Sequence, residues 1–370
     1  MSTNPKTLEL RGECRVMFAF DVGHEIDLAG TASTVRDPST AGTLGHTHPA
    51  PSHFQFAPPP LRVAQRDATL TLGRWSTTQA IEVVLFEFGA VLVSYSIPFA
   101  GTLDDCVELS CALAADRTLA AAAQRRVVEL AQGIEAQITK PGTAEILEDY
   151  QVFRFAEEAL GADADKFVAQ HGLALARVLR AERGALANEE TADALATRLQ
   201  YAPSDCAVLD WHAAVLFDDD PEDVLRVLEY ANVQLLEMRF LDAQLDRALE
   251  GSARLVSRRG ARRWLGPLAL HRDLERLAAM HVEAAFLFER LGNTLKVSGD
   301  QYLARVLRQA GARFRLREWN EAAQRKLAAL DDIYDKMHDH ASTLRAEFLE
   351  WLIVILIVLE IALSLIGTRG

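Results

Sequence analysis

The sequence predicts an α+β protein in which a mixed strand and helix domain is followed by long antiparallel helices and a C-terminal transmembrane helix. Three observations predict this architecture. Short apolar runs separated by Gly and Pro fill the first half of the 370-residue chain. Apolar residues at heptad spacing recur through the second half. The last apolar run contains a single charged residue.

Composition limits the classes of function. The chain is 49% hydrophobic and 25% charged, which is ordinary for a globular protein, and its length allows two domains with substantial cores. A net charge of −13 argues against binding nucleic acid over the whole surface. The N-terminus shows no secretory or transit signal, and the 4 cysteines have no CxxC spacing. We therefore expect most of the chain to lie in the reducing cytoplasm.

The α+β domain is predicted over residues 13–218, after a disordered stretch at 1–12. Residues 31–60 are rich in Pro, Ser, Thr and Gly without an apolar period, which predicts an irregular loop. Histidines in this loop have no cysteine or carboxylate at a useful spacing, so no metal is expected. Strands are predicted at 13–22, 68–75, 81–97, 145–155 and 198–218, and helices at 102–115, 119–138, 165–183 and 189–199.

Two stretches of this domain resemble each other. VVLFEFGAVLV at 83–93 and AVLDWHAAVLF at 207–217 each place an acidic and aromatic centre between apolar runs. Duplication of a sheet element would produce such a similarity between two stretches. Asp205, Asp210 and His212 are considered as an acid–base group, with a packed sheet histidine as the alternative.

A long-helix domain is predicted over residues 219–347. The acidic run at 218–223 is interpreted as a helix N-terminus with Asp220 as N-cap and Pro221 in the first turn, and a metal cluster is the alternative. Heptad spacing follows at Val224, Leu228, Ala231, Leu235 and Met238. Further helices are predicted at 268–296, at 299–313 and from 316 onward.

A second heptad seam leads into the terminal apolar segment. Its members are Leu330, Tyr334, Met337, Ala341, Leu344, Phe348 and Trp351. Residues 348–367 have the composition of a transmembrane helix, with a buried core helix as the alternative. Trp351 lies at the interface position, while Glu360, Ser364 and Gly367 share a face that predicts contacts between anchors. We therefore expect a single C-terminal anchor in the inner membrane, in contact with lipid.

Five arginines form a basic cluster in an otherwise acidic chain. They are Arg254, Arg258, Arg259, Arg262 and Arg263, with Trp264 beside them. Three interpretations stay open: a solvated helix end, a contact with anionic lipid, or a contact with an RNA backbone.

Polar residues recur along the predicted long helices. One group is Glu229, Asn232, Glu237, Arg239 and Asp242, and the other is Lys296, Asp300, Gln301 and Arg305. If the two helices face each other, these residues form interhelical ion pairs; otherwise they line a polar pocket. The sequence contains no GxSxG, GxxxxGK[ST] or HExxH motif, so the catalytic residues of any enzyme activity stay unknown, and we expect no cofactor and no metal.

Five blocks together resemble the required-for-meiotic-nuclear-division family. They are VVLFEFGAVLVSYSIP at 83–98, YAPSDCAVLDWHAA at 201–214, VLEYANVQLLEMRFLDAQLD at 227–246, LFERLGNTLKVSGDQYLARV at 287–306 and LEWLIVILIVLEI at 349–361. The resemblance implies a bacterial, homo-oligomeric, membrane-anchored relative of a mitochondrial protein linked to translation, with the ribosome or RNA as a partner. It implies no catalytic residues.

Two functions from different classes therefore stay open. The first is a membrane-anchored, homo-oligomeric scaffold or interaction protein, which the heptads and the terminal segment favour. The alternative is a hydrolase or nucleic-acid-processing enzyme that uses the polar faces of the long helices.

Overall fold

The computed structural model describes residues 9–35, 54–56, 58–142, 145–161, 163–258, 295–297 and 301–367, with isolated positions between 275 and 285. These residues belong to two compact units. The first unit contains residues up to Phe240 together with Leu291–Glu318, and the second contains Leu241–Arg290 and Trp319–Gly370. The predicted boundary at 218 differs from this division, because the long helix that follows it first packs on the sheet.

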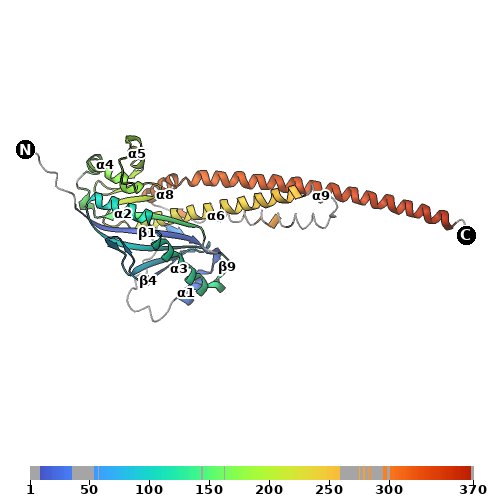
Figure 1. Ribbon diagram of the computed structural model, residues 1–370, viewed down its shortest axis with the longest axis horizontal. Helices are drawn as coiled ribbons and strands as arrows, with labels where there is room; N and C mark the ends of the chain where they lie inside the picture. Colours follow the sequence, from blue (N-terminus) through green and yellow to red (C-terminus); the bar gives the residue numbers. More distant parts are fainter. Residues whose placement is uncertain are drawn as a thin grey trace, which may run out of the picture. The chain divides into compact units, whose positions relative to one another are not determined.

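The first unit is built on an 8-stranded sheet (Figure 1). In spatial order the strands are β11 (Arg198–Leu199), β12 (Cys206–Leu209), β13 (Ala213–Phe217), β10 (Leu147–Phe155), β1 (Leu10–Asp21), β8 (Ala90–Gly101), β7 (Ala80–Leu85) and β4 (Leu61–Arg66). β1 pairs antiparallel with both β8 and β10, whereas β10 and β13 pair in parallel. Three small pairs are β2 (Gly23–Ile26) with β9 (Ile138–Pro141), β5 (Thr71–Leu72) with β6 (Trp75–Ser76), and β3 (Phe54–Phe56) with β14 (Leu295–Val297).

Helices cover both faces of the sheet. Against one face pack α2 (Leu103–Ala115), α3 (Thr118–Gly133) and α4 (Ala164–Arg180); against the other pack α6 (Glu222–Arg258) and α8 (Gln301–Arg313). The other helices among the described residues are α1 (Leu28–Val35), α5 (Asn188–Ala194), α9 (Leu316–Gly367) and the 3-10 turns Glu135–Gln137 and Glu157–Ala159.

The alternation of β1 explains the two cores. Val16 and Phe18 join the core under α2, α3 and α4, while Met17 and Ala19 join the core under α6 and α8. A strand places successive side chains on opposite faces, so a strand that is buried on both faces is apolar at successive positions. The run VMFAF meets this condition, and it lies at the centre of the sheet.

The predicted strands and helices of the first unit are largely observed, with local differences. The predicted loop at 31–60 begins inside α1 and contains β3; its residues 58–60 are irregular, and the others lie outside the described part. The predicted helix at 189–199 ends at Ala194, because Arg198 and Leu199 pair with β12 instead. The two similar stretches at 83–93 and 207–217 each form a hairpin of this sheet, β7 with β8 and β12 with β13. The predicted helix at 268–296 falls almost wholly outside the described residues.

The second unit contains the end of α6 and most of α9. Leu241 and Leu245 are buried on α6, and Leu330 and Met337 are buried on α9. The Lys326 ammonium donates to Asp242 at 2.6 Å and lies 2.6 Å from Asp246, which joins the two helices directly. The first part of the predicted second seam is therefore buried within one chain.

The prediction of a transmembrane helix, and with it of a tail anchor, is wrong. Within the described ranges, no helix combines the length and the apolarity that crossing a bilayer requires. A span needs about 20 predominantly apolar residues, whereas the uninterrupted apolar run of α9 from Trp351 ends at Glu360. The described residues therefore form a mixed sheet unit and a unit of long helices, and none of their helices is the membrane-spanning element that the sequence predicted.

Candidate functional site

A group of charged residues interrupts the apolar face under α6. On this face β1 contributes Glu13 and Arg15, β4 contributes Arg62, and β7 contributes Glu82. Their strand neighbours point to the opposite core, because side chains alternate along each strand. The face is therefore apolar along one part of α6 and charged along another.

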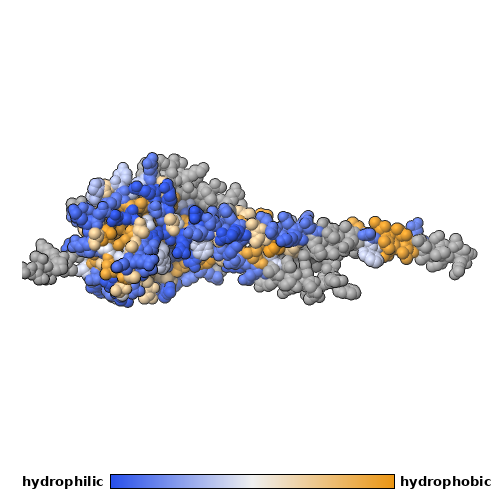
Figure 2. All heavy atoms as spheres, turned by 90° about the horizontal axis from the view of Figure 1, so that it is seen from above, coloured by the Kyte–Doolittle hydropathy of each residue, from blue (hydrophilic) through white to orange (hydrophobic). Residues whose placement is uncertain are grey.

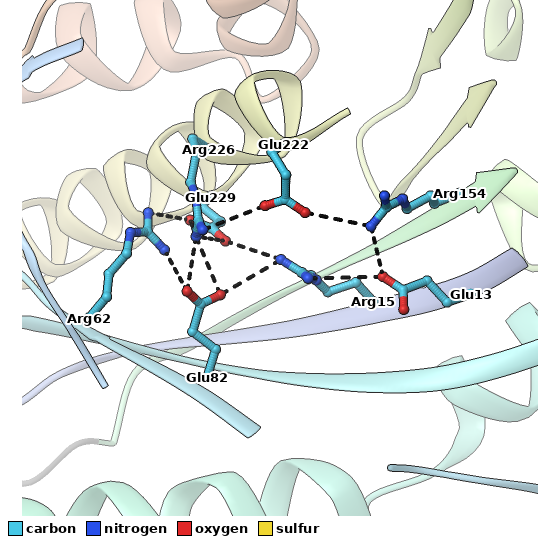
Figure 3. Close-up of polar contacts among 8 residues, drawn as sticks. All are labelled: Glu13, Arg15, Arg62, Glu82, Arg154, Glu222, Arg226 and Glu229. Atoms are coloured by element: carbon cyan, nitrogen blue, oxygen red, sulfur yellow. Dashed lines mark hydrogen bonds and ion pairs between the residues drawn. The ribbon is translucent and has the colours of Figure 1, made fainter. Parts of the chain in front are cut away.

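The centre of this group is Glu229 on α6, whose side chain is 1% exposed (Figure 3). One carboxylate oxygen accepts from Arg62 at 2.7 Å, and the other accepts from Arg226 at 3.2 Å. Glu82 accepts from the same two guanidinium groups, at 3.2 Å from Arg62 and 3.1 Å from Arg226. The helix and two strands are thus joined by two carboxylates that share two arginines.

A second layer of the group adds Arg15 and three more exposed residues, Glu13, Arg154 and Glu222. Arg15 lies 3.7 Å from Glu82, and Arg154 of β10 lies 3.3 Å from Glu13 and 3.5 Å from Glu222 (Figure 3). Across both layers the figure labels four glutamates and four arginines, so the charges balance. We call these eight residues the α6–sheet ion network.

Opposing effects fix the protonation of the buried members. Burial raises the pKa of Glu229, but attraction to Arg62, Arg226 and Arg15 outweighs it and holds the pKa below its usual value. Burial lowers the pKa of Arg226, and attraction to Glu229 and Glu82 raises it above its usual value. Both groups are therefore charged at neutral pH, and Glu229 carries no proton to give. This chemistry fits a structural clamp better than an acid–base site.

A second cluster surrounds Asp210, which is fully buried in the turn between β12 and β13. Arg180 of α4 donates to its carboxylate at 2.5 Å, and Arg313 of α8 lies 3.6 Å away. The same two arginines also contact Asp193 of α5. Burial raises the pKa of Asp210, and the backbone of Trp211 and the two guanidinium groups oppose that shift. The cluster ties α4, α5 and α8 to one hairpin.

The acid–base group considered from the sequence has separate partners for each member. Asp205 accepts from the backbone N–H groups of Tyr201 and Ala202, both at 2.8 Å. The ring Nε2 of His212 lies 3.1 Å from the Gln151 amide nitrogen. Burial lowers the pKa of His212, which favours the neutral ring of a packed histidine over a poised base.

The polar residues predicted on α6 reach different partners. Glu229 belongs to the α6–sheet ion network, Arg239 donates to Glu148 of β10, and Asp242 pairs with Lys326 in the second unit. Asn232 and Glu237 are buried. The pairing of these residues with the second predicted group, as interhelical ion pairs or as the lining of one pocket, stays a prediction, because that group is only partly within the described residues.

The second predicted group is only partly described. Arg305 is exposed, donates to the carbonyl of Gln200 at 2.9 Å, and lies over the ring of Tyr302. Gln301 is exposed at the start of α8. Lys296 pairs with Gln55 through the β14 to β3 register, and Asp300 lies outside the described residues.

The arginine cluster and the terminal segment are also only partly described. Arg254 and Arg258 lie in the last turns of α6, while Arg259, Arg262 and Arg263 fall outside the described residues. Trp351 and Glu360 are exposed on α9. The backbone at Ser364 and Gly367 is helical.

Sequence reasoning missed most members of both clusters. Arg15, Arg62, Glu82 and Arg226 were not singled out, nor were Arg180 and Arg313. A signal was present for part of the first set, because Glu82 is an isolated charge inside an apolar strand sequence. Such a charge is rarely buried without a partner. The partner itself lies far along the chain and leaves no local pattern.

Metal and thiol chemistry find little support in the described structure. Among the residues that the structure describes, no group of three His, Cys, Asp or Glu side chains is arranged to hold a metal ion. The cysteines are free and buried, and burial raises the pKa of Cys14 and Cys106, which opposes thiolate formation.

Comparison with known proteins identifies relatives of the sheet domain. A family model described as "Uncharacterized protein MJ0711, N-terminal domain" matches residues 11–223. The uncharacterized protein MJ0711 of Methanocaldococcus jannaschii is 26% identical over 230 residues, which cover 62% of this chain and 69% of that protein. No solved structure matches. The family match covers the whole sheet and stops at the first turn of α6.

Proposed function

Since the chain belongs to the family of the uncharacterized protein MJ0711, N-terminal domain, which assigns no reaction, we propose a function from the chemistry of its surfaces. We propose that the protein is a homo-oligomeric scaffold, and that copies associate through the terminal part of α9. The sheet unit serves as the folded body that this association brings together.

A run of exposed apolar side chains on α9 carries this proposal. Leu349, Trp351 and every residue from Ile353 to Leu359 are large, hydrophobic and between 44% and 68% exposed. Figure 2 displays hydrophobic residues along this part of the helix. Contiguous apolar surface of this kind marks interaction sites, whereas single exposed hydrophobic residues are normal. A partner surface of the same chemistry is present on each further copy of the chain.

The seam that packs within the chain stops before this run. Leu330 and Met337 are buried in the second unit, so they are not available to a partner. Their replacement by Asp would therefore unfold that unit, and a loss of association in such a variant would have no simple meaning. The exposed run from 349 to 359 is the better place to test association.

The enzyme alternative needs polar helix faces that are open to a substrate. Glu229, Arg239 and Asp242 instead hold charged partners within their own units. Ion pairs of this kind stabilise the packing of the helix against its neighbours. A connection to translation, with the ribosome or RNA as a partner, rests on sequence resemblance alone and enters the proposal only as a partner to look for.

Sedimentation velocity of the purified full chain without detergent tests the proposal. We expect a species heavier than one chain that dissociates on dilution, and we expect the variant Ile355→Glu to sediment as a monomer. Tyr201→Ser is the matched control, because Tyr201 is 78% exposed but lies in a loop of the sheet unit. A wild-type chain that stays monomeric at high concentration would refute the proposal.

A further inference from the structure

The exposed run of α9 is apolar around more of the helix than one partner helix can cover. At 3.6 residues per turn, successive residues are separated by about 100° around the axis. The apolar residues on the side away from acidic groups are Val354, Val358, Trp351, Ile355, Leu359 and Leu356, in order around the helix. From Val354 to Leu356 this arc spans about 200°. All six side chains are exposed in the single chain.

The width of this arc decides how many helices are needed. A two-helix seam buries a narrow stripe of two positions per heptad, whereas a helix that faces a larger core has a wider apolar face. In a two-helix pair centred on Ile355, the residues at the edges of the arc, Val354 and Leu356, stay in water. Three or more helices packed around a common core cover such edges.

Acidic residues define the opposite side. Glu350 and Glu360 lie on that side, with Ile353 and Ile357 between them. An unpaired carboxylate is costly to bury, so this side must face solvent in any assembly. The orientation of the helix in the assembly follows from this constraint, with Ile355 toward the centre and Glu360 outward.

The exposed apolar area of α9 also favours a bundle of more than two helices. The six large apolar side chains of the arc, each about half exposed, offer roughly 600 Å². A stable association uses about 800 Å² from each partner. A two-helix pair would use only about half of this surface, whereas a bundle uses nearly all of the acid-free side.

We propose that the terminal parts of α9 from at least three copies of this chain pack into one helical bundle, with Ile355 at its centre and Glu350 and Glu360 on its outer side. This inference rests on the proposed function, because it specifies the number and orientation of the associating copies.

Light scattering coupled to size-exclusion chromatography of the full chain, without detergent, distinguishes the proposed bundle from the proposed association through α9 in general. A mass of three or more chains supports the bundle. A mass of two chains overturns the bundle and leaves association through α9 standing. A mass of one chain overturns both, and so does a single chain that instead sediments with phosphatidylcholine vesicles.

Two matched variants test the geometry independently of the wild-type mass. Leu356→Glu places a charge at the edge of the arc, and Ile353→Glu places the same charge on the acidic side. The bundle requires Leu356→Glu to lower the mass to one or two chains, while Ile353→Glu retains the wild-type mass. Equal masses for the two variants would overturn the arrangement. Both residues are exposed, so unchanged far-ultraviolet circular dichroism is expected and verifies that each variant folds.

Discussion

Replacing Glu229 by Gln would remove the charge at the centre of the α6–sheet ion network without changing the size of the side chain. Glu229 is 1% exposed and accepts from Arg62 and Arg226. After the change, Glu82 would be the carboxylate shared by three guanidinium groups, those of Arg62, Arg226 and Arg15. The more exposed Glu222 and Glu13 would each remain near one of them. The buried arginines cannot lose their protons, so the excess positive charge would persist in a low-dielectric site.

The expected loss of stability follows from the burial of the pair. Removing one partner of a buried ion pair costs about 3 to 5 kcal/mol, because the other charge is left uncompensated. Glu82 is 25% exposed and retains part of the neutralisation, so we expect a value near the lower limit, about 3 kcal/mol. A loss of this size is a large part of the stability of an ordinary domain.

Hydrogen exchange of the β1 and β7 amides is a suitable assay, because it reports the opening of the sheet unit separately from the helical unit. A loss of about 3 kcal/mol accelerates exchange of the slowest amides by roughly two orders of magnitude. Glu222→Gln is the matched control on the same helix: Glu222 is 34% exposed, so we expect about 1 kcal/mol or less. Equal effects of the two substitutions would refute the assignment of Glu229 as the buried centre.

The pH dependence gives an independent check. The pKa of Glu229 is lower in the folded chain than its usual value of 4.5. Its contribution to stability is therefore complete above the unfolded pKa and is lost as the pH falls through the folded one. The difference between wild type and Glu229→Gln should shrink only in strongly acidic solution. A difference that disappears near pH 6 would contradict the charge-based explanation.

Two further substitutions test other parts of the sheet unit. Gly89→Ala should lower the free energy of unfolding in urea by about 2 to 4 kcal/mol, because φ at Gly89 is +93° and an added Cβ would meet the carbonyl oxygen of Gly23 at 1.7 Å. Gly73→Ala is the matched control. There φ is +60° and nothing lies within 4 Å, so the substitution should cost only about 1 kcal/mol. Burial raises the pKa of Glu148 from 4.5 to about 7 despite its contact with Arg239. Between these pH values the folded chain holds a proton on Glu148 that the unfolded chain has lost. The free energy of unfolding should therefore fall, by up to about 3 kcal/mol, as the pH rises from about 4.5 to 7. Glu148→Gln should abolish this slope, and an unchanged slope in unfolding experiments between these pH values would show that another group is responsible.

The hairpins of the sheet could be predicted because their signals are local. The stretch at 81–97 contains two apolar runs separated by Phe88 and Gly89, and the structure forms β7, a turn and β8 there. The capping residue Thr102 likewise precedes α2, where its side chain accepts from the backbone of Asp105. In both places the residues that determine the geometry are neighbours in sequence.

The candidate sites could not be predicted in the same way, because their partners are distant in sequence. Arg62 and Glu229 are separated by 167 residues, and Arg313 and Asp193 by 120. The expected partners of Asp242 were residues of the 296–305 region, but the structure places Lys326 beside it. Complementary charge alone allowed both pairings, and only the packing of the helices selects one.

Heptad spacing also could not identify the surface against which a helix packs. It predicts that one face of a helix is covered, but a face of the same chain and a face of another copy give the same spacing. Leu330 and Met337 are covered within the chain, whereas Trp351 and Val358 of the continuing pattern are exposed. The distinction follows from the other side of the helix. Around Met337 the remaining positions are largely charged, so one partner helix is sufficient there. Around Ile355 the apolar arc continues past the edges of the seam, and only a larger assembly of helices can cover it.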